Sequence, residues 1–226
     1  MRADAEQIAR VDEGVASRSI YDLIRDDILE GRLAANERLK VGELALRLGT
    51  STNPVREALQ QLRGEGFVLF EPNRGARVRP LDADFVRDSF EVEMLIEPYL
   101  TRWFVRIVTE RELGELEAIE AEIEALNFSD PAAHAALDLR FHRLMYDRHY
   151  NRNAAEIWWK HRRILGAIAG RFPVSISPRL AVVQEHRALI ALIRVQDAEG
   201  AGALIERHVE NSGKHLIERM RAADPR

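Results

Sequence analysis

The sequence contains no cysteine, which excludes disulfide bonds and any metal site built on thiolates. It also has no run of 18 apolar residues, and its first residues lack the apolar segment that directs secretion. We therefore expect a chain that works in the cytoplasm and neither crosses nor enters a membrane. Aromatic residues make up only 7%, while 46% hydrophobic and 31% charged residues are typical of a globular protein. The 226 residues suffice for a small domain and a medium one.

Positive charge is scarce overall, because the formal net charge is −4. Residues 17–80 nevertheless hold 11 Lys or Arg against nine Asp or Glu, a net of +2. Residues 81–226 hold 20 against 24, and residues 1–16 hold two against four. The basic excess therefore lies in residues 17–80. Since it is modest, tight binding to DNA is expected to need two copies of this segment and to weaken steeply with salt.

The chain divides into three segments at its polar and proline-containing stretches. Residues 1–16 are polar and unpatterned, which predicts a flexible arm. Pro80 breaks the chain, and the sequence LDAD that follows supplies caps for a new helix. We therefore expect one domain over residues 17–80 and a second over residues 81–226.

A helix with one apolar face and one polar face is predicted between Gly49 and Gly66. Three residues able to cap a helix precede Pro54, which suits a first helical turn, and Gly66 stops the pattern. The helix is thus expected to begin near residue 53. Its apolar stripe is formed by Val55, Leu59 and Leu62, and its second face carries the polar residues Asn53, Arg56, Gln60 and Arg63.

The polar face carries the residue types with which a helix recognises DNA bases. Arg recognises guanine with two hydrogen bonds and Asn or Gln recognises adenine in the DNA major groove, which admits one helix. A helix face that merely contacts water would have the same spacing. The neighbouring segments decide between these interpretations.

Both flanks favour a winged helix-turn-helix. Upstream, the apolar residues of 41–48 predict a short helix that ends at Gly49, a few residues before the next helix. Downstream, 67–70 and 76–80 read as strands around a turn at 71–75. This hairpin would carry Arg74 at its tip, with Arg77 and Arg79 beyond, as a basic wing. The alternative is a hairpin whose charged edges discourage aggregation.

Residues 81–226 show helical period and no strand alternation. The expected helices are 85–107 (one helix, or two with a kink at Pro98), 110–126, 130–150, 153–171, 179–195 and 198–221, with a proline-bounded loop at 172–178. About six helices with short connections favour an antiparallel bundle. Together with a first helix around residues 20–31, the predicted fold class is mainly α, with three helices and a two-stranded wing ahead of the bundle.

The stretch GELALRLGTSTNPVREALQQLRGEGFV, followed by NRGARV, resembles the winged helix-turn-helix of GntR-type bacterial repressors. The resemblance implies that operator DNA is contacted by Ser51, Thr52, Asn53, Arg56, Gln60, Arg74 and Gly75. Relatives commonly have an Arg and then a Thr directly after the Ser that precedes the recognition helix, where this chain has Thr52 and Asn53. The operator sequence is therefore expected to differ, while the mode of binding stays the same.

A second constellation lies in the predicted bundle. Asp138 and His142 are four residues apart and project from one side of a helix, and His186 and His208 come from the last two helices. Converging imidazoles and a carboxylate suit a borderline divalent cation. On spacing alone, histidines that are solvated or bonded singly remain the alternative, because four others compete for the same role: His134, His149, His161 and His215.

The segments LDLRFHRLMYDRHYNRN, QEHRALIALIRVQDAEGA and ERHVE are similar to the all-helical effector domain (FCD) of the FadR branch of GntR regulators. In metal-binding members, an Asp and a His four apart join one His from each of the last two helices. The resemblance thus implies a divalent ion, Zn²⁺ first and Ni²⁺ or Mn²⁺ next, on Asp138, His142, His186 and His208. Open coordination positions would take an oxygen-bearing metabolite.

One departure concerns the effector. Many relatives have an Arg four residues before the Glu of the first bundle helix, and this chain has Glu93 ahead of Glu97. A cationic, amide-bearing or larger effector is therefore expected in place of a small anion. Arg140, Arg162, Arg163 or Arg171 could supply the missing charge, and a Trp ring could stack on the ligand. The effector-binding candidates are Glu93, Arg140, Trp158 and Arg162.

The resemblance implies a transcriptional repressor, not an enzyme. It would act as a homodimer on a pseudo-palindromic double-stranded operator, and a small-molecule effector in the bundle would shift the two recognition helices. A metal-dependent hydrolase with an appended helix-turn-helix is the rival, because three His and one Asp with open positions could activate water. A protein interaction module with a vestigial helix-turn-helix is a third hypothesis.

Overall fold

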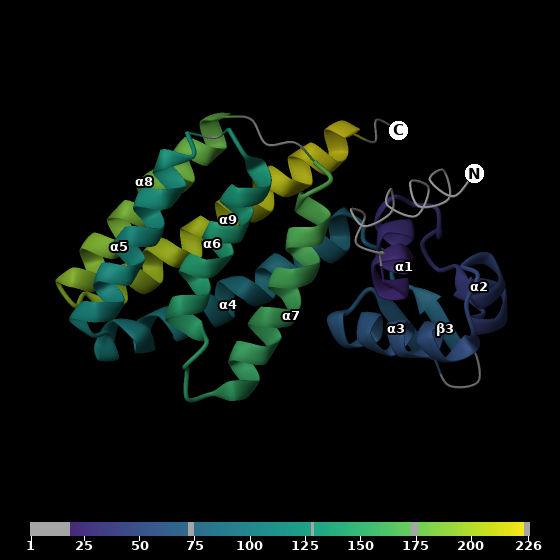
Figure 1. Cartoon of the computed structure of the whole chain (residues 1–226). Coiled ribbons are helices and arrows are strands. Elements are labelled where there is room, and N and C mark those ends of the chain that lie inside the picture. Colours follow the sequence, from purple (N-terminus) through teal and green to yellow (C-terminus); the bar gives the residue numbers. More distant parts are fainter. Residues whose placement is uncertain (1–18, 72–74, 128, 173–175, 224–226) are drawn as a thin grey trace, which may run out of the picture. The chain divides into compact units, whose positions relative to one another are not determined.

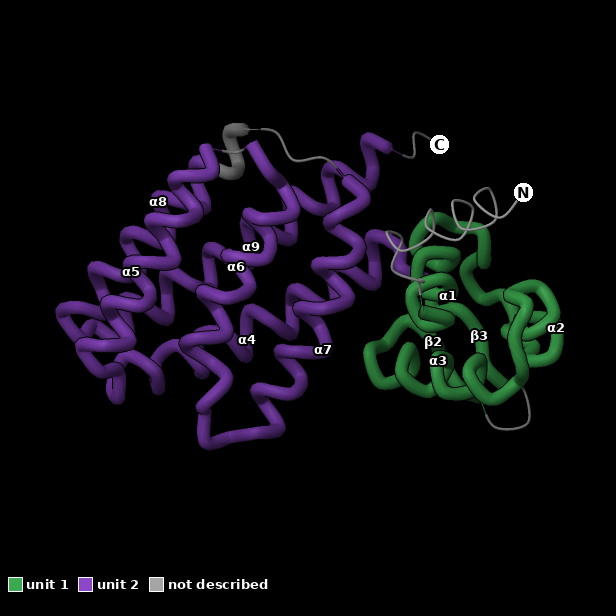
Figure 2. Tube along the Cα trace, viewed as in Figure 1, with its two compact units in different colours: residues 1–79 green, residues 80–226 purple. Residues whose placement is uncertain are grey.

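The structure, a computed structural model, describes residues 19–71, 75–127, 129–172 and 176–223. The chain forms two compact units, residues 1–79 and residues 80–226, here called the N-terminal and C-terminal units (Figure 2). Figure 1 labels the helices and strand β3. The predicted arm at residues 1–16 lies outside the described residues.

The N-terminal unit combines helices with one small antiparallel sheet. Its elements are α1 (Ile20–Leu29), β1 (Arg38–Leu39), α2 (Val41–Arg47), α3 (Thr52–Glu65), β2 (Val68–Glu71) and β3 (Gly75–Val78). The strand order is β1-β3-β2. The predicted two-stranded wing is confirmed as β2 and β3, which pair antiparallel. Strand β1 adds a third strand, because Leu39 pairs with Ala76 on the other edge of β3.

Helix α3 follows from its sequence at both ends. Ser51 has the extended backbone of an N-cap, and Pro54 falls in the first turn, where its missing N–H leaves no bond unmade. Gly66 ends the helix in the left-handed region, with φ of 94°, which costs a glycine little. Both predicted ends are confirmed to within a residue. The apolar stripe is buried as expected: Val55, Leu59 and Leu62 are in the core.

A buried carboxylate fixes α2 against α1. Asp27 accepts hydrogen bonds from Arg32 Nε and Arg47 Nη2, each at 2.6 Å. Arg47 is the last residue of α2, so this contact joins the helix that precedes the turn to the first helix of the unit. The turn that presents the start of α3 is thereby supported from its N-terminal side.

The described part of the C-terminal unit is entirely helical. It consists of α4 (Ala83–Ile107), α5 (Glu110–Ala125), α6 (Pro131–Tyr146), α7 (Arg152–Ala169), α8 (Ile176–Arg194) and α9 (Ala198–Ala223). Pro98 lies inside α4, which is one helix, so the two-helix alternative was wrong. Helix α8 begins three residues earlier than predicted, and residues 173–175 of the predicted loop lie outside the described residues.

Helices α4 and α9 make the most extensive contact in the described part of this unit. Two glycines of α9 allow their close approach. A Cβ built on Gly213 would lie 2.8 Å from Phe90 Cγ, and one on Gly202 would lie 2.7 Å from Arg102 Nε. Both distances are shorter than a van der Waals contact. At Gly202 the flexible Arg102 side chain could move away, whereas at Gly213 the added Cβ would meet the Phe90 ring close to its own Cβ, so Gly213 is the more restricted position.

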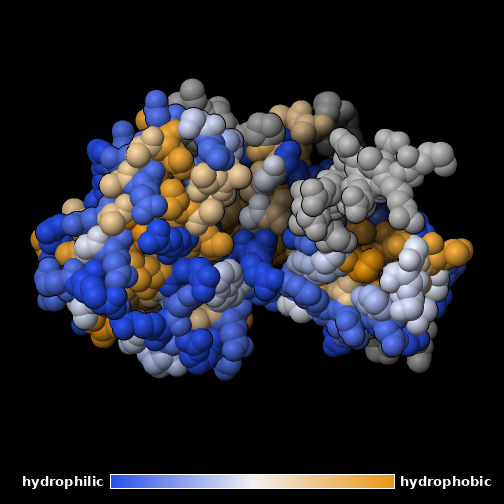
Figure 3. Space-filling model, viewed as in Figure 1, coloured by the Kyte–Doolittle hydropathy of each residue, from blue (hydrophilic) through white to orange (hydrophobic). Residues whose placement is uncertain are grey.

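The core of the C-terminal unit draws side chains from α4 to α9 and includes Phe104, Leu116, Phe141 and Ile205. On the face visible in Figure 3, hydrophobic residues (orange) and hydrophilic residues (blue) are interspersed. Among the described residues, none of the helices combines the length and the apolar character needed to span a bilayer.

Candidate nucleic-acid interface and metal centre

The start of α3 presents polar side chains to solvent on one face. Asn53, Arg56 and Gln60 are all exposed, opposite the stripe that packs on the core. Within the described part of the chain, no hydrogen bond or ion pair engages these three side chains. Ser51 and Thr52 are also exposed, and the Ser51 hydroxyl does not cap the helix. This face therefore keeps its donors and acceptors available to a partner.

The helix terminus adds a second feature suited to DNA. The first N–H groups of α3 have no partner within the helix, and the helix dipole concentrates positive potential there. A DNA phosphate fits such a terminus. The exposed side chains can then meet base edges while the backbone holds a phosphate.

The structure describes the strands of the wing but only one of its two predicted DNA-contacting residues. Gly75 is exposed at the start of β3 with φ of 78°, and Arg74 lies outside the described residues. Arg77 donates to the carbonyl of Asn36 at 3.2 Å. Arg79 does not extend the basic wing, because its Nε donates to the carbonyl of Gly66 at 2.5 Å and holds the end of α3.

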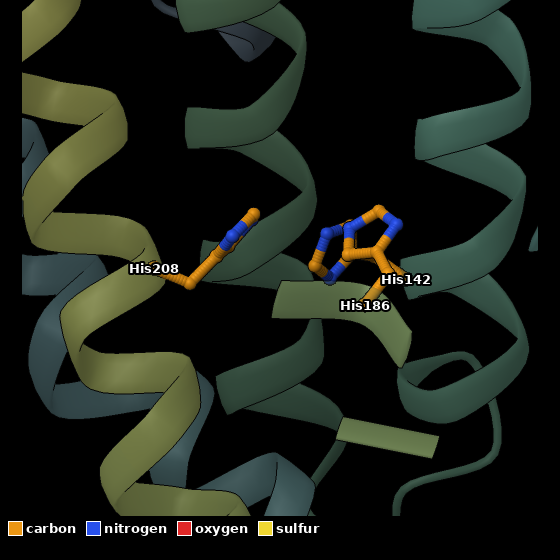
Figure 4. Close-up of side chains that lie close together, drawn as sticks. All are labelled: His142, His186 and His208. Atoms are coloured by element: carbon orange, nitrogen blue, oxygen red, sulfur yellow. The ribbon is translucent and has the colours of Figure 1, made fainter. Parts of the chain in front are cut away.

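Three buried imidazoles meet in the C-terminal unit. His142 comes from α6, His186 from α8 and His208 from α9, and the side chains point toward one another (Figure 4). One ring nitrogen from each lies within 4.8 Å of the others. Burial lowers the pKa of His142 well below its usual value, so this ring is neutral. A neutral imidazole is the form that binds a metal ion.

Outer carboxylates orient two of the three rings. Glu120 Oε2 lies 2.8 Å from His186 Nδ1, and Glu185 Oε2 lies 2.7 Å from His208 Nδ1. With Nδ1 donating to a carboxylate, Nε2 of each ring keeps its lone pair for the centre of the cluster. This is the arrangement that orients metal-binding histidines and raises their basicity.

Asp138 completes the cluster and divides its two oxygens between two partners. Its Oδ1 lies 3.6 Å from His186 Nε2 and 4.0 Å from His142 Nε2, while its Oδ2 contacts the Arg162 guanidinium. Burial alone would raise the pKa of Asp138, but Arg162 and then the imidazoles outweigh it and hold the pKa below its usual range. Asp138 is therefore ionised, with one oxygen left facing the imidazoles.

The donor set fits a divalent ion. Neutral imidazoles and one carboxylate are ligands of Zn²⁺ and, with more open positions, of Ni²⁺ or Mn²⁺. Nε2 of His142 and Nε2 of His186 are buried and have no hydrogen-bond partner among the described residues. Each such atom costs about 1–3 kcal/mol, which a bond to a metal would offset. Two nitrogens bound to one tetrahedral Zn²⁺ lie about 3.4 Å apart, so the ring nitrogens, which lie within 4.8 Å of one another, would have to approach by up to about 1.4 Å.

A second group of charges adjoins these ligands. Glu93 and Glu97, one turn apart on α4, are both buried, and Glu97 Oε2 lies 3.7 Å from His142 Nδ1. Burial raises the pKa of Glu93 to about 8 and that of Glu97 to about 7. Tyr146 donates to Glu97 at 3.2 Å. Two carboxylates so placed favour an additional positive charge or hydrogen-bond donor nearby.

The structure brings together only some of the effector candidates. Glu93 and Arg162 lie beside the cluster, and Trp158 is buried with its ring edge-on to Tyr146 at 5.0 Å. Arg140 does not join them. It sits two residues after Asp138, on the opposite side of α6, and is exposed in an ion pair with Glu122 at 3.3 Å.

Sequence reasoning missed the outer carboxylates. Glu120 stands on the apolar stripe of α5, one turn from Leu116 and from Ile123, and this position was the available signal for a buried acid. Glu185 directly precedes His186 and has no such signal. Of the competing histidines, His149 is buried in another group, where its ring lies 4.6 Å from those of Trp103 and Tyr150.

Two family matches together cover most of the chain. Residues 88–211 match the FCD domain, and residues 16–78 match the bacterial regulatory proteins of the gntR family. The HTH-type transcriptional regulator BphR of Paraburkholderia xenovorans is 28% identical, over 93% of this chain and 89% of its own length. The HTH-type transcriptional repressor RspR of Escherichia coli is 23% identical, over 86% of each chain.

Solved structures share the fold. The Listeria monocytogenes structure described as Lar, which controls expression of the agr system, has a TM-score of 0.67 at 20% identity, covering 93% of this chain and all of that one. The metal-free FCD domain of TM0439 has a TM-score of 0.52 at 21% identity, covering 63% of this chain and 98% of that one. At these identities the likeness concerns the fold alone.

Proposed function

Because the chain belongs to the GntR family of bacterial regulatory proteins and carries an FCD domain, we propose that it is a cytoplasmic repressor controlled by a metabolite. The chain is a DNA-binding transcriptional regulator of the GntR type, and its relatives include a named repressor. The observation that carries the proposal is the exposed, unengaged polar face of α3 in the N-terminal unit. That face reads a pseudo-palindromic operator in the major groove.

The same proposal assigns a divalent metal, Zn²⁺ first, to Asp138, His142, His186 and His208. Its support is the convergence of three buried imidazoles, two of which, His186 and His208, are oriented by the carboxylates of Glu120 and Glu185. The ion would supply a Lewis-acidic anchor for an oxygen of the effector. Arg162 holds the second oxygen of Asp138 and so keeps the first directed at the ion.

Binding to the DNA upstream of the protein's own gene tests the regulatory function. We expect footprints at two half-sites about one helical turn apart and an affinity that falls steeply as salt rises. If the protein bound all DNA sequences equally, or bound no DNA, the interaction-module hypothesis would be the better one. The family match disfavours the hydrolase hypothesis, and turnover of ester or amide substrates by the metal-loaded protein would revive it.

We propose that the protein acts as a homodimer through α4. Val92, Leu95 and Tyr99 repeat at helical spacing and are exposed, Leu95 to 77%. The stripe continues into Tyr150, whose hydroxyl lies 2.5 Å from that of Tyr99. An exposed apolar stripe next to aromatic rings is typical of a surface that a second protein covers. A second copy of this chain would satisfy the two-fold symmetry that a palindromic operator needs.

Leu95→Asp is expected to convert the dimer into a monomer. Light scattering after gel filtration would then report a mass near 25.8 kDa in place of twice that value. A charge in the centre of an apolar interface has to be desolvated without a partner, which disfavours association by several kcal/mol. Val195→Asp is the control, because Val195 is as exposed but lies beyond α8. Equal masses for both variants and the wild type would remove α4 from the interface.

Glu120→Gln is expected to weaken Zn²⁺ binding about tenfold. Loss of an outer partner lowers metal affinity about 10–100-fold, and the amide oxygen of Gln can still accept a bond, so the low end applies. Competition with a chromogenic chelator measures the affinity. Glu122→Gln is the matched control, because Glu122 lies on the same helix and faces solvent. Unchanged affinity in Glu120→Gln, or an equal loss in Glu122→Gln, would contradict the assigned role.

A further inference from the structure

We propose that Glu97 is the third outer carboxylate of the metal centre. When His142 binds the ion through Nε2, its Nδ1–H donates a hydrogen bond to Glu97 Oε2. Glu97 is then a positioning residue, because it orients a ligand without touching the ion. The inference rests on the metal centre proposed above, and it adds α4 to the helices that hold the ion.

The three imidazoles of the cluster differ in how they are held. Glu120 Oε2 lies 2.8 Å from His186 Nδ1, and Glu185 Oε2 lies 2.7 Å from His208 Nδ1. By contrast, His142 is fully buried, and neither of its ring nitrogens has a hydrogen-bond partner among the described residues. Buried polar atoms are normally bonded. The ion would satisfy one of these nitrogens, and the other needs a partner from the protein.

Metal binding decides which nitrogen of His142 carries the proton. Asp138 Oδ1 lies 4.0 Å from His142 Nε2, so Nε2 is the nitrogen on the side of the other ligands. A neutral imidazole that gives the lone pair of Nε2 to a metal keeps its proton on Nδ1. Nδ1 of His142 therefore becomes a buried donor, and a buried donor without an acceptor is destabilising.

Glu97 lies on the Nδ1 side of His142. Its side chain is 3% exposed, and its Oε2 lies 3.7 Å from Nδ1, which is too far for a hydrogen bond. The bond would form if this distance shortened to the 2.8 Å of the pair between Glu120 and His186. A change of this size needs only small rotations about the side-chain bonds of Glu97. The acceptor that His142 needs is therefore within reach.

Two buried hydroxyl groups hold Glu97 beside the ring. Tyr146 donates to Glu97 Oε2 at 3.2 Å, and Thr101 Oγ1 lies 2.8 Å from the Tyr146 hydroxyl. Glu93 is a further hydrogen-bonding neighbour of the Glu97 carboxyl group. A carboxyl oxygen has two lone pairs, so Oε2 can accept from Tyr146 and from His142 at the same time. The new bond therefore does not require that the existing one be broken.

The bond would connect α4 to the ion. The four ligands come from α6, α8 and α9, Glu120 lies on α5, and Arg162 of α7 contacts Asp138. With Glu97 bonded to a ligand, each of the six helices in the described part of the C-terminal unit would contribute to the centre. Metal binding would then act directly on α4, the helix that carries the exposed Leu95.

Two variants separate the hydrogen bond from the volume of the side chain. Met and Gln are both close to Glu in size, but only Gln keeps an acceptor oxygen. In the full-length protein we expect Glu97→Met to lower Zn²⁺ affinity about 100-fold and Glu97→Gln about tenfold, the two ends of the range for an outer partner. Competition with a chromogenic chelator measures both affinities. Thr101→Val, also buried on α4, is the matched control and should change the affinity less than about threefold.

Nuclear magnetic resonance of the histidine rings tests the bond itself. In the zinc-saturated wild type, the Nδ1–H signal of His142 should be visible, because a hydrogen bond slows its exchange with water. In zinc-saturated Glu97→Met this signal should disappear, while those of His186 and His208 remain. A role of Glu97 in folding alone would not remove one signal of the three.

The inference is overturned if folded Glu97→Met binds Zn²⁺ as tightly as the wild type or keeps the His142 signal. It is also overturned if Glu97→Gln or Thr101→Val loses as much affinity as Glu97→Met. Circular dichroism reports folding. If Glu97→Met does not fold, crystals of the zinc-loaded wild type decide: a distance of about 2.8 Å between Glu97 Oε2 and His142 Nδ1 supports the bond, and one that stays at 3.7 Å contradicts it.

The metal content of the wild type separates this inference from the proposed function. A wild type that holds one Zn²⁺ per chain but gives any of the contradicting results removes only the role of Glu97. A wild type that holds no stoichiometric zinc by elemental analysis refutes the proposed metal centre, and the role of Glu97 with it.

Discussion

A variant carrying His142→Ala and His186→Ala is expected to contain no stoichiometric metal, where the wild type contains one ion per chain. Two of four ligands are removed, and both rings lie at the centre of the cluster with their Nε2 atoms directed inward. Each metal–imidazole bond contributes several kcal/mol, so two deletions take the affinity below what dialysis against a weak chelator retains. Elemental analysis of the dialysed proteins measures the ratio.

His215→Ala is the control for this experiment. His215 lies on α9, like His208, but its side chain is 44% exposed, and its Nδ1 lies 3.7 Å from Glu218 Oε2 rather than in the cluster. Its loss is expected to leave the ratio at one ion per chain. The thermal midpoint of the wild type should rise on adding Zn²⁺, and that of the double variant should not, because only a folded state that binds metal is stabilised by mass action. Full metal occupancy in the double variant would mean that other residues are the ligands.

Arg56→Ala is expected to lower operator affinity by at least about 30-fold while the fold is unchanged. One bidentate contact between Arg and guanine is worth about 1–3 kcal/mol, and a dimer loses two of them. Arg56 is exposed on α3 and has no partner in the described part of the chain, so its removal breaks no internal contact. Fluorescence anisotropy with labelled operator, at fixed salt, measures the loss.

Arg56→Lys separates base reading from charge. Lys keeps the positive charge but cannot form the two parallel bonds of a guanidinium. We expect Arg56→Lys to bind random DNA as the wild type does and to lose discrimination for the operator. Operator affinity equal to that of the wild type in both variants would show that α3 does not enter the groove.

Local signals were sufficient to predict α3. A capping residue, a proline in the first turn, an apolar stripe and a terminal glycine act over a few residues, and each depends on backbone geometry alone. Nothing from the rest of the chain had to be known. The same applies to the six helices of the C-terminal unit, whose apolar periodicity is long enough to outweigh Pro98.

Tertiary contacts explain why the sequence-based predictions failed for β1, Arg79 and Arg140. Strand β1 has two residues and no periodicity, so only its pairing with β3, Arg38 with Arg77 and Leu39 with Ala76, defines it. Arg79 looked like a wing cation, and its burial against the carbonyl of Gly66 depends on how the chain returns to α3. Arg140 and Arg162 were equivalent in sequence. Which of them meets Asp138 depends on the rotation of α6 and α7 in the bundle, and α7 supplies the one that does.

The histidine cluster could be predicted only in part. The spacing of Asp138 and His142 indicates that they share one face of a helix. Whether this face lies against α8 and α9 depends on how the helices pack, which the spacing does not give. The resemblance to FCD domains selected His186 and His208 among seven histidines. The outer carboxylates come from two further places, α5 and the residue before His186, which no local pattern connects to the centre.

Anomalous diffraction from crystals grown with Zn²⁺, recorded on both sides of the zinc absorption edge, tests the metal centre most directly. We predict one peak per chain, about 2.1 Å from Nε2 of His142, His186 and His208, with Asp138 Oδ1 as the fourth ligand. A peak held by other residues, or none between these three rings at full zinc loading, would contradict the account.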